Sequence, residues 1–443
     1  MSTNSMQAQD SSLPTEAEVV IIGGGIIGSA TAYYLAKRGV DVVLLDKGAI
    51  GYEQSTRNWG WVHQQVRYPH LIPLAVESVK LWQNLNDELD ADLEWVQGGN
   101  LSLGFDDADT AAFEHWAQDA RDRGLETEIL SRGQVSEMLP GSQGRWTNGL
   151  HVPSDGQANP DRVTDAFARA ATNLGAHILT DCAALGIDSQ AGAVHAVRTE
   201  RGPIRATSVV CAAGAWSARF LRTLGLSLPQ SAVRSTVVRT APIAPLTDLT
   251  AWGDGYTFRQ DRAGRLILAS GATAIYDVTL DLLHDLRRFA PLAWSNRRWV
   301  RLHVGKPLFN DLAALIPGSA AKREFWQRRR RIDPPAHPAS VRSSLAGLRA
   351  MFPALADTAI DTTWAGNIDT TPDHAPVLGS IAEAPDGFYL ATGLSGHGFA
   401  LGPGSGKLMS ELVTGDAPSV DPHPFRFTRF AENDLPPMPE LRH

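Results

Sequence analysis

The chain has 443 residues, which is too long for one compact core and suits two interleaved domains. Its net charge of −8 argues against nucleic acid as a partner, because binding phosphates needs an excess of lysine and arginine on one face. The two cysteines, Cys182 and Cys211, form no paired motif, and no clustered metal-ligand spacing is present, so we expect neither a disulfide framework nor a metal site.

The first residues carry no targeting signal. Residues 1–17 are polar, with no basic start and no apolar run, so they predict a disordered leader rather than a signal peptide. The apolar stretch 19–22 is far shorter than the roughly 20 residues that a membrane helix needs. We therefore expect no membrane span and a soluble, cytoplasmic protein.

A strand–loop–helix–strand unit follows. The β-branched run at 18–22 predicts a strand buried on both faces, and the segment 29–38 predicts a helix that ends at Gly39. A second buried strand is expected at 41–45, closed by Asp46.

Gly23, Gly25 and Gly28 fit the GxGxxG pattern between the first strand and the helix. The first glycine makes the tight turn, the second lets the backbone approach a pyrophosphate, and the third lets helix and strand pack closely. Asp46 follows Gly28 by 18 residues, about where an acid that binds the ribose is expected. This unit predicts a dinucleotide site, and an acid at 46 disfavours a 2′-phosphate.

Further along the chain, nucleotide-type and antiparallel elements alternate. Residues 54–67 are too polar for a core and too rich in rings for a solvated linker. The expected elements are a helix at 71–89, short strands at 94–105 and 128–149, strands at 175–179, 192–199 and 208–214, antiparallel strands at 235–241 and 256–270 with a hairpin turn at 261–264, a basic helix at 282–301, a basic surface loop or interface at 322–331, and a strand–loop–helix at 388–414.

Two other motifs fail on inspection. Gly402–Lys407 superficially suggests a P-loop, but Leu408 stands where a serine or threonine would hold magnesium. Ser395 does not form a GxSxG nucleophile elbow.

Several segments resemble the D-amino acid oxidase-like family of FAD-dependent oxidoreductases, which includes sarcosine and glycine oxidases. They are residues 209–217, 364–379, 393–399 and 402–406, and with the N-terminal unit they span most of the chain in the family's order. The resemblance implies an α/β fold, with a Rossmann-type FAD-binding domain and an interleaved α+β substrate domain built on an antiparallel sheet. The ranges implied are 18–82, 150–220 and 340–425 for the FAD-binding domain, and 83–149 and 221–339 for the substrate domain.

The resemblance also implies where FAD lies. Ser55 and Thr56 would reach the pyrophosphate, Arg57 would lie near the isoalloxazine, and Ala184 would pack by the adenine. A helix starting near 402–406 would aim its dipole at the reduced flavin. The expected FAD contacts are Gly23, Gly25, Ile26, Ile27, Gly28, Asp46, Lys47, Ser55, Thr56, Arg57, Asn58, Ala184, Gly214, Trp216, Gly366, Gly393, Gly396, His397 and Gly398.

The chain departs from its family at informative positions. Gly366 lies in the stretch where sarcosine oxidases carry a flavin-linked cysteine, and Arg57 or Asn58 stands where related dehydrogenases carry a flavin-linked histidine, so we expect non-covalent FAD. Ala400 replaces the lysine that holds the substrate carboxylate, which leaves Arg67 or Arg259 as candidates for that role.

The substrate site is less constrained by the sequence. Trp59, Trp61 and His63 either line the cavity or pack at the domain interface, and His303 is either structural or catalytic. The candidate catalytic residues are Arg57, His63 and His303, and the candidate substrate contacts are Trp59, Trp61, Arg67, Tyr256 and Arg259.

The expected reaction is oxidation of the C–N bond of a small amine or amino acid. A hydride passes to flavin N5, and water hydrolyses the imine. Electrons then go to oxygen or to another acceptor. The alternatives are a dehydrogenase subunit that docks to a partner, with 322–331 as a docking segment, and a non-catalytic FAD module. A homo-oligomer is compatible with the sequence.

Overall fold

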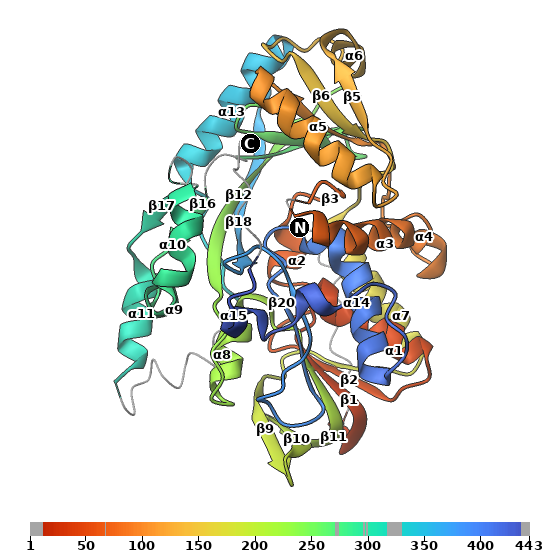
Figure 1. The fold of residues 1–443 in the computed structure, drawn as a ribbon, viewed down its shortest axis with the longest axis vertical. Coiled ribbons are helices and arrows are strands. Elements are labelled where there is room, and N and C mark those ends of the chain that lie inside the picture. Colours follow the sequence, from red (N-terminus) through yellow and green to blue (C-terminus); the bar gives the residue numbers. More distant parts are fainter. Residues whose placement is uncertain are drawn as a thin grey trace.

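The computed structural model describes residues 12–66, 68–270, 274–295, 297, 300–316 and 330–435. Most of the expected leader, Arg67 and residues 322–329 of the basic run lie outside the described residues. The first strand, β1 (Glu16–Ile22), begins within the range that was expected to be a leader. In Figure 1 a nucleotide-type sheet with its helices occupies the lower half, and a larger sheet runs along the left and over the top.

The nucleotide-type sheet is parallel at its centre. β1 pairs in parallel with β2 (Val42–Leu45) and with β11 (Gly202–Cys211), so that Ile22 lies beside both Leu45 and Cys211. The carboxyl ends of the three strands therefore meet at one edge, where open α/β sheets bind ligands. The remaining strands of this sheet are β8 (His177–Leu179), β9 (Ala184–Gln190), β10 (Ala193–Thr199), β19 (Val377–Ser380) and β20 (Phe388–Thr392).

Helices from distant parts of the chain pack together on one face of this sheet (Figure 1). A Cβ on Gly402 would lie 2.8 Å from the Ile26 side chain, and a Cβ on Gly406 would lie 2.5 Å from the Ala30 Cβ. Glycine at these positions lets the helix axes come close. The helices of this layer are α1 (Ile26–Lys37), α3 (Ile72–Trp82), α7 (Pro160–Asn173) and α14 (Gly398–Thr414).

The larger sheet is mainly antiparallel, as expected, with two parallel pairs. The predicted hairpin at 261–264 is confirmed, because Gly264 has a φ of +79° and the strands on either side pair. The strands are β4 (Asn100–Gly104), β5 (Glu128–Ser131), β6 (Asn148–Val152), β12 (Ser231–Pro242), β13 (Thr250–Trp252), β14 (Thr257–Gln260), β15 (Arg265–Ala269), β16 (Ala274–Asp277), β17 (Val300–His303) and β18 (Ile360–Thr370).

Two elements differ from the sequence-based expectation. β18 pairs along β12, which puts 360–370 in the larger sheet although that range was assigned to the FAD-binding domain. The single helix expected at 282–301 is two short ones, α9 (Leu280–His284) and α10 (Leu286–Ser295), because the chain turns at Asp285 between them.

The remaining elements are short or peripheral. They are α2 (Gln54–Arg57), β3 (Trp61–Val62), α4 (Leu85–Glu88), α5 (Asp107–Arg121), α6 (Arg132–Met138), β7 (Gly156–Gln157), α8 (Ser217–Arg222), α11 (Lys306–Ala314), α13 (Pro338–Met351) and α15 (Arg429–Glu432).

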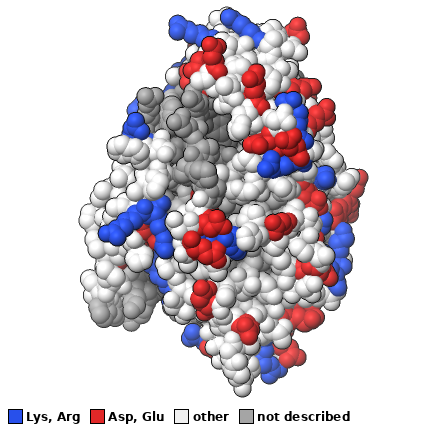
Figure 2. Space-filling view, in the orientation of Figure 1, with Lys and Arg blue, Asp and Glu red and all other residues white. Residues whose placement is uncertain are grey.

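The described surface carries exposed apolar side chains on α10, β17 and α11, and the face drawn in Figure 2 carries mixed charge. Trp294 of α10, Leu302 of β17, and Phe309 and Leu315 on and after α11 are all exposed large apolar side chains. Acidic and basic side chains are interspersed on the face drawn in Figure 2, which gives its described part no uniformly basic surface of the kind that nucleic acid needs. Within the described ranges, no helix is both long enough and apolar enough to span a bilayer.

Candidate active site

A pocket of about 1380 Å³, including its open mouth, lies at the carboxyl edge of β1, β2 and β11. Its lining comes from all three segments that were expected to form the FAD-binding domain. The expected FAD contacts that line it are Gly23, Gly25, Ile26, Ile27, Asp46, Lys47, Ser55, Asn58, Ala184, Gly214, Trp216, Gly396 and Gly398.

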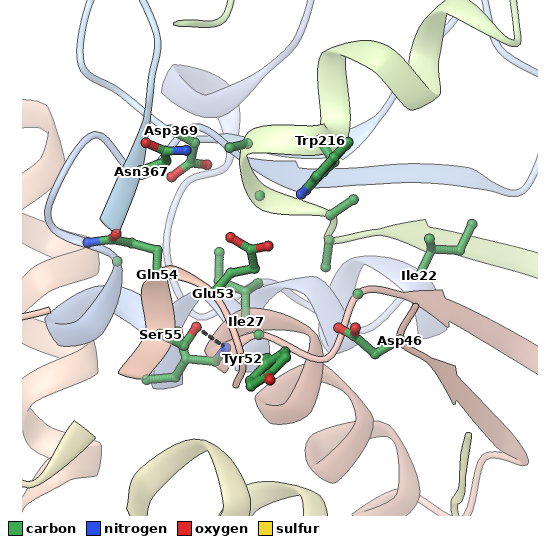
Figure 3. Close-up of a pocket in the computed structure, with 18 of the residues that line it drawn as sticks. Ile22, Ile27, Asp46, Tyr52, Glu53, Gln54, Ser55, Trp216, Asn367 and Asp369 are labelled. Atoms are coloured by element: carbon green, nitrogen blue, oxygen red, sulfur yellow. Dashed lines mark hydrogen bonds between the residues drawn. The ribbon is translucent and has the colours of Figure 1, made fainter. Parts of the chain in front are cut away.

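The glycine loop has the geometry that a phosphate loop needs. Gly23 has a φ of +110°, and a Cβ there would lie 2.4 Å from the Ala212 carbonyl oxygen. A Cβ on Gly28 would lie only 1.9 Å from the Gly23 carbonyl oxygen. Helix α1 starts directly at Ile26, whose N–H donates to Ser55 Oγ at 2.9 Å (Figure 3). The start of α1 therefore opens into the pocket, where its N–H groups and dipole suit an anion.

Asp46 marks one side of the pocket, beside Ile22 in Figure 3. Its carboxylate accepts hydrogen bonds from Gly24 N and Gly48 N, both at 2.7 Å. Burial raises the pKa of Asp46, and these two bonds partly offset that rise. The carboxylate is thus held at the end of β2, where a ribose hydroxyl of a dinucleotide is expected.

Asp369 and Asn367 lie on the opposite side of the pocket in Figure 3. Asp369 accepts hydrogen bonds from Gly393 N at 2.7 Å and from Thr392 Oγ1 at 3.1 Å, and burial raises its pKa. Its position within 364–379 was recognised as a family segment, but the residue itself was not singled out. It fixes the loop that carries Gly396 into the pocket.

Three residues expected to contact FAD have other partners. The Thr56 hydroxyl donates to Gly51 O at 2.8 Å, which turns it away from the pyrophosphate position. A Cβ on Gly366 would lie 2.1 Å from Gln54 Oε1, so this glycine makes room for Gln54.

Arg57 is the third. It is buried, donates to Tyr52 O at 3.3 Å and to Ile332 O, and lies 3.5 Å from Asp333. Burial lowers its pKa. Gly28, Gly393 and His397 also lie outside the pocket lining.

Helix α14 begins at Gly398 and not near 402–406 as the sequence suggested. Gly402–Gly406 lie inside the helix and pack on α1 and α3, where Ser78 Oγ accepts from Gly404 N at 3.0 Å. The Ala400 carbonyl accepts from Ser78 Oγ and from Trp82 Nε1, at 2.6 and 3.0 Å. The residues at the N-terminal end of α14 that line the pocket are therefore Gly396 and Gly398.

An aromatic wall adjoins the pocket at Asn58. We use this name for Trp59, Trp61, Trp252 and His63. The three indole rings form a triangle with centroid separations of 5.7, 6.1 and 6.1 Å. His63 contacts Trp61 at 6.0 Å, and it reaches the loop of Gly396 through a 5.2 Å ring contact with His397. Burial lowers the pKa of His63 to about 4, so the wall is uncharged at neutral pH.

Trp252, at the end of β13, was not anticipated. It lies 193 positions after Trp59 and carries no motif of its own, so only the pairing of β13 with β14 brings it to the wall. Since large rings at the end of a strand are common, the sequence held no signal that distinguished it.

Arg259 lies under the aromatic wall. It is 6% exposed, donates to Gln157 Oε1 at 3.0 Å and to the Trp59 carbonyl, and a Cβ on Gly60 would lie 2.6 Å from its Nη2. Burial lowers its pKa to about 10, so it is still a cation at neutral pH. Among the residues that the structure describes, no carboxylate lies at ion-pair distance from it, although Asp261, Glu94 and Asp161 favour its charge from farther away. A buried cation whose carboxylate neighbours are all distant favours an anionic ligand.

Two other residues, one a candidate substrate contact and one a candidate catalytic residue, do not lie at the pocket. Tyr256 is buried in the core of the larger sheet, with its ring on Phe258 and its hydroxyl on the Met351 sulfur. His303 is half exposed on β17, and its Nδ1 lies 2.7 Å from Asp277 Oδ1. Both positions follow from strand pairing that the sequence did not reveal. No group of three potential metal ligands occurs in the described part of the chain.

The comparisons with known proteins agree with this geometry. The chain is 27% identical to sarcosine oxidase subunit beta of Rhizobium meliloti (strain 1021), over 94% of this chain and 89% of that one. It is 27% identical to mitochondrial sarcosine dehydrogenase of Mus musculus, but it spans only 42% of that protein's length. The solved structure of L-amino acid deaminase from Proteus myxofaciens, in complex with anthranilate, superposes with a TM-score of 0.90 at 27% identity, over 96% of each chain.

The family model for the FAD-dependent oxidoreductases called DAO matches residues 18–412. This range includes the glycine loop, Asp46 and the segment around Gly396, which together form the pocket. The chain belongs to the DAO family of FAD-dependent oxidoreductases, and its cofactor is FAD.

Proposed function

We propose that this protein oxidises the C–N bond of an α-amino acid with an apolar or aromatic side chain. The observation that carries the proposal is the buried Arg259, which has hydrogen bonds but no close carboxylate among the described residues, beside the uncharged aromatic wall. A cation and an apolar surface side by side fit the carboxylate and the side chain of one small molecule.

The chain's own residues would position the substrate. Arg259 has a planar guanidinium fork that matches a carboxylate, and Ala400 leaves no lysine to compete for it. Trp59, Trp61 and Trp252 would contact the substrate side chain and keep water away from it. When bound, FAD supplies the hydride acceptor for the carbon that bears the nitrogen, and water hydrolyses the resulting imine.

We propose that the cofactor is held without a covalent bond. The stretch in which sarcosine oxidases carry a flavin-linked cysteine has no cysteine in this chain, and at Gly366 within it a side chain would collide with Gln54. Arg57 and Asn58 replace the flavin-linked histidine, and neither forms such a bond.

The relatives support an amino acid as the substrate, and the bound ligand of one of them supports an aromatic one. The deaminase structure holds anthranilate, which carries an amine and a carboxylate on an aromatic ring. Other relatives are named glycine oxidase, as in Bacillus subtilis (strain 168), which is 26% identical over 93% of this chain.

Anaerobic reduction of the bound flavin tests the proposal. L-Phenylalanine and L-leucine should bleach the flavin absorbance, whereas glycine and sarcosine should do so slowly or not at all. Bleaching by sarcosine but not by L-phenylalanine would overturn the assignment of the aromatic wall as a side-chain subsite.

A second candidate concerns the electron acceptor. The exposed apolar side chains on α10 and α11, among them Trp294 and Phe309, favour a dehydrogenase that passes electrons to another component rather than to oxygen. An oxidase should release one hydrogen peroxide per substrate oxidised, whereas a dehydrogenase should need an added dye to turn over.

A further inference from the structure

A short segment before α13 borders the FAD pocket through Arg330, although it is remote in sequence from the other lining segments. We call residues 330–333 the strap. Ile332 N donates to Glu53 Oε1 at 2.8 Å, while Arg57 donates to Ile332 O and lies 3.5 Å from Asp333. The backbone of the strap is therefore bonded to Glu53 and to α2, and Glu53, Gln54 and Ser55 line the pocket (Figure 3).

Arg330 joins the strap to the side of the pocket where Asp46 lies. Its Nη1 and Nη2 donate to Glu200 Oε1 and Oε2 at 2.6 and 2.7 Å, and Nη1 also donates to Lys47 O at 3.0 Å. Glu200 Oε1 in turn accepts from Ala183 N at 3.0 Å. One bidentate ion pair thus connects the strap to Lys47, which follows β2, and to Ala183, which precedes β9.

Both members of this ion pair are charged at neutral pH. The hydrogen bonds to Glu200 raise the pKa of Arg330. Burial would raise the pKa of Glu200, but the bonds from Arg330 and from Ala183 N outweigh it and lower that pKa. The Arg330 side chain is 32% exposed and that of Glu200 is 17% exposed, so salt reaches the pair and weakens it.

The strap also packs closely on the loop after Asp46. A Cβ on Gly48 would lie 2.9 Å from the Arg330 carbonyl oxygen, and the Arg331 guanidinium lies 4.4 Å from the centre of the Tyr52 ring. The two described arginines of the predicted surface run therefore lie at the cofactor pocket, because carboxylate and aromatic partners from the FAD-binding segments hold them there.

We propose that the strap is a clasp for the adenosine half of FAD and that the Arg330–Glu200 ion pair retains the bound cofactor. Arg330 lines the pocket beside Asp46, Lys47 and Ala184, which is the side expected to hold the ribose and the adenine. Asp369 lies on the opposite side of the pocket in Figure 3, where it holds the loop of Gly393 and Gly396 that was expected to lie by the flavin ring. The clasp thus governs release of the cofactor and leaves the flavin environment unchanged.

The rate of FAD release from the holoenzyme tests this proposal, read as the rise of flavin fluorescence after dilution. Arg330→Met and Glu200→Gln should each release FAD about tenfold faster, which is the scale of one lost charge-assisted contact. Because the two residues form one interaction, the double variant should be no faster than either single variant. Raising the salt concentration should speed release from the wild type but not from Arg330→Met.

Arg239→Met is the matched control. It removes a partly exposed arginine that pairs with Asp361 at 2.6 Å on the larger sheet, outside the pocket lining. Its release rate should equal that of the wild type, and the visible spectrum of bound flavin should be the same in every variant.

Gly48→Ala provides an independent variant with both charges intact, since its methyl group would push the strap backbone outward. It should also speed release, so the proposal stays testable if Arg330→Met does not fold. Wild-type release rates in both Arg330→Met and Gly48→Ala would overturn the proposal. The proposal would also be overturned if Arg330→Met lowered the melting temperatures of the apoprotein and the holoenzyme equally, because the contact would then be merely structural. None of these readouts involves a substrate, so they are independent of the proposed reaction.

Discussion

Replacing Arg259 by methionine is the sharpest perturbation of the proposed substrate site. Methionine keeps much of the side-chain volume but removes the guanidinium group. Arg259 is only 6% exposed and lies beneath the aromatic wall. Losing one partner of a buried, hydrogen-bonded charge pair costs about 2–5 kcal/mol. With about 1.36 kcal/mol per factor of ten, a loss of 3 kcal/mol lowers kcat/KM for L-phenylalanine about 100-fold.

The assay has to separate this loss from a structural one, because Arg259 also donates to Gln157 and to the Trp59 carbonyl. Binding of anthranilate and of aniline, followed by the change in flavin absorbance, makes that separation. The two ligands differ by one carboxylate. Arg259→Met should weaken anthranilate binding about 100-fold and change aniline binding little. Arg259→Lys should restore part of the affinity for anthranilate, because it returns the charge without the planar fork. Equal weakening of both ligands would refute the carboxylate role.

Other residues give further predictions. Gly28→Ala should yield protein without flavin absorbance, because its Cβ would lie 1.9 Å from Gly23 O; a normal flavin content would contradict the tight-turn argument. Trp252→Ala should raise KM for L-phenylalanine about tenfold, which corresponds to one aromatic contact, with little effect on KM for L-alanine; steady-state kinetics on both substrates decide this. Burial raises the pKa of Asp155 to about 8 despite hydrogen bonds from Gln64, whereas the pKa of an aspartate in an unfolded chain is about 3.9. Because the folded state holds this proton more tightly, the free energy of unfolding should fall as pH rises from about 4 to about 8. Asp155→Asn should remove most of that fall in melting temperature, and an unchanged pH profile would show that Asp155 does not cause it.

The part of the site that could be predicted lies close together in sequence. Gly23, Gly28 and Asp46 belong to one strand–loop–helix–strand unit, whose local geometry fixes their positions relative to one another. The family resemblance then extended the site to Gly396 and Gly398, since those segments carry recognisable glycine patterns.

The part that could not be predicted depends on contacts between distant segments. Trp252 reaches the wall only because β13 pairs with β4 and β14, and Arg330 reaches the pocket only through Glu200 and Lys47. Thr56 was placed by the family resemblance, and its hydroxyl instead meets Gly51 O five residues earlier. Tyr256 was named as a substrate contact, but its hydroxyl meets the sulfur of Met351, 95 positions later.

The pairing of α1 with α14 has a consequence for how the protein is made. Gly402 and Gly406 pack on Ile26 and Ala30, so one side of the helix behind the phosphate loop is covered by residues more than 370 positions later in the chain, while α7 covers another side. A ribosome synthesises about 5–20 residues per second, so for roughly 20 seconds or more the emerging phosphate loop lacks that cover. We therefore expect stable FAD binding only after α14 has been synthesised and has packed on α1, so that cofactor supply acts after this step.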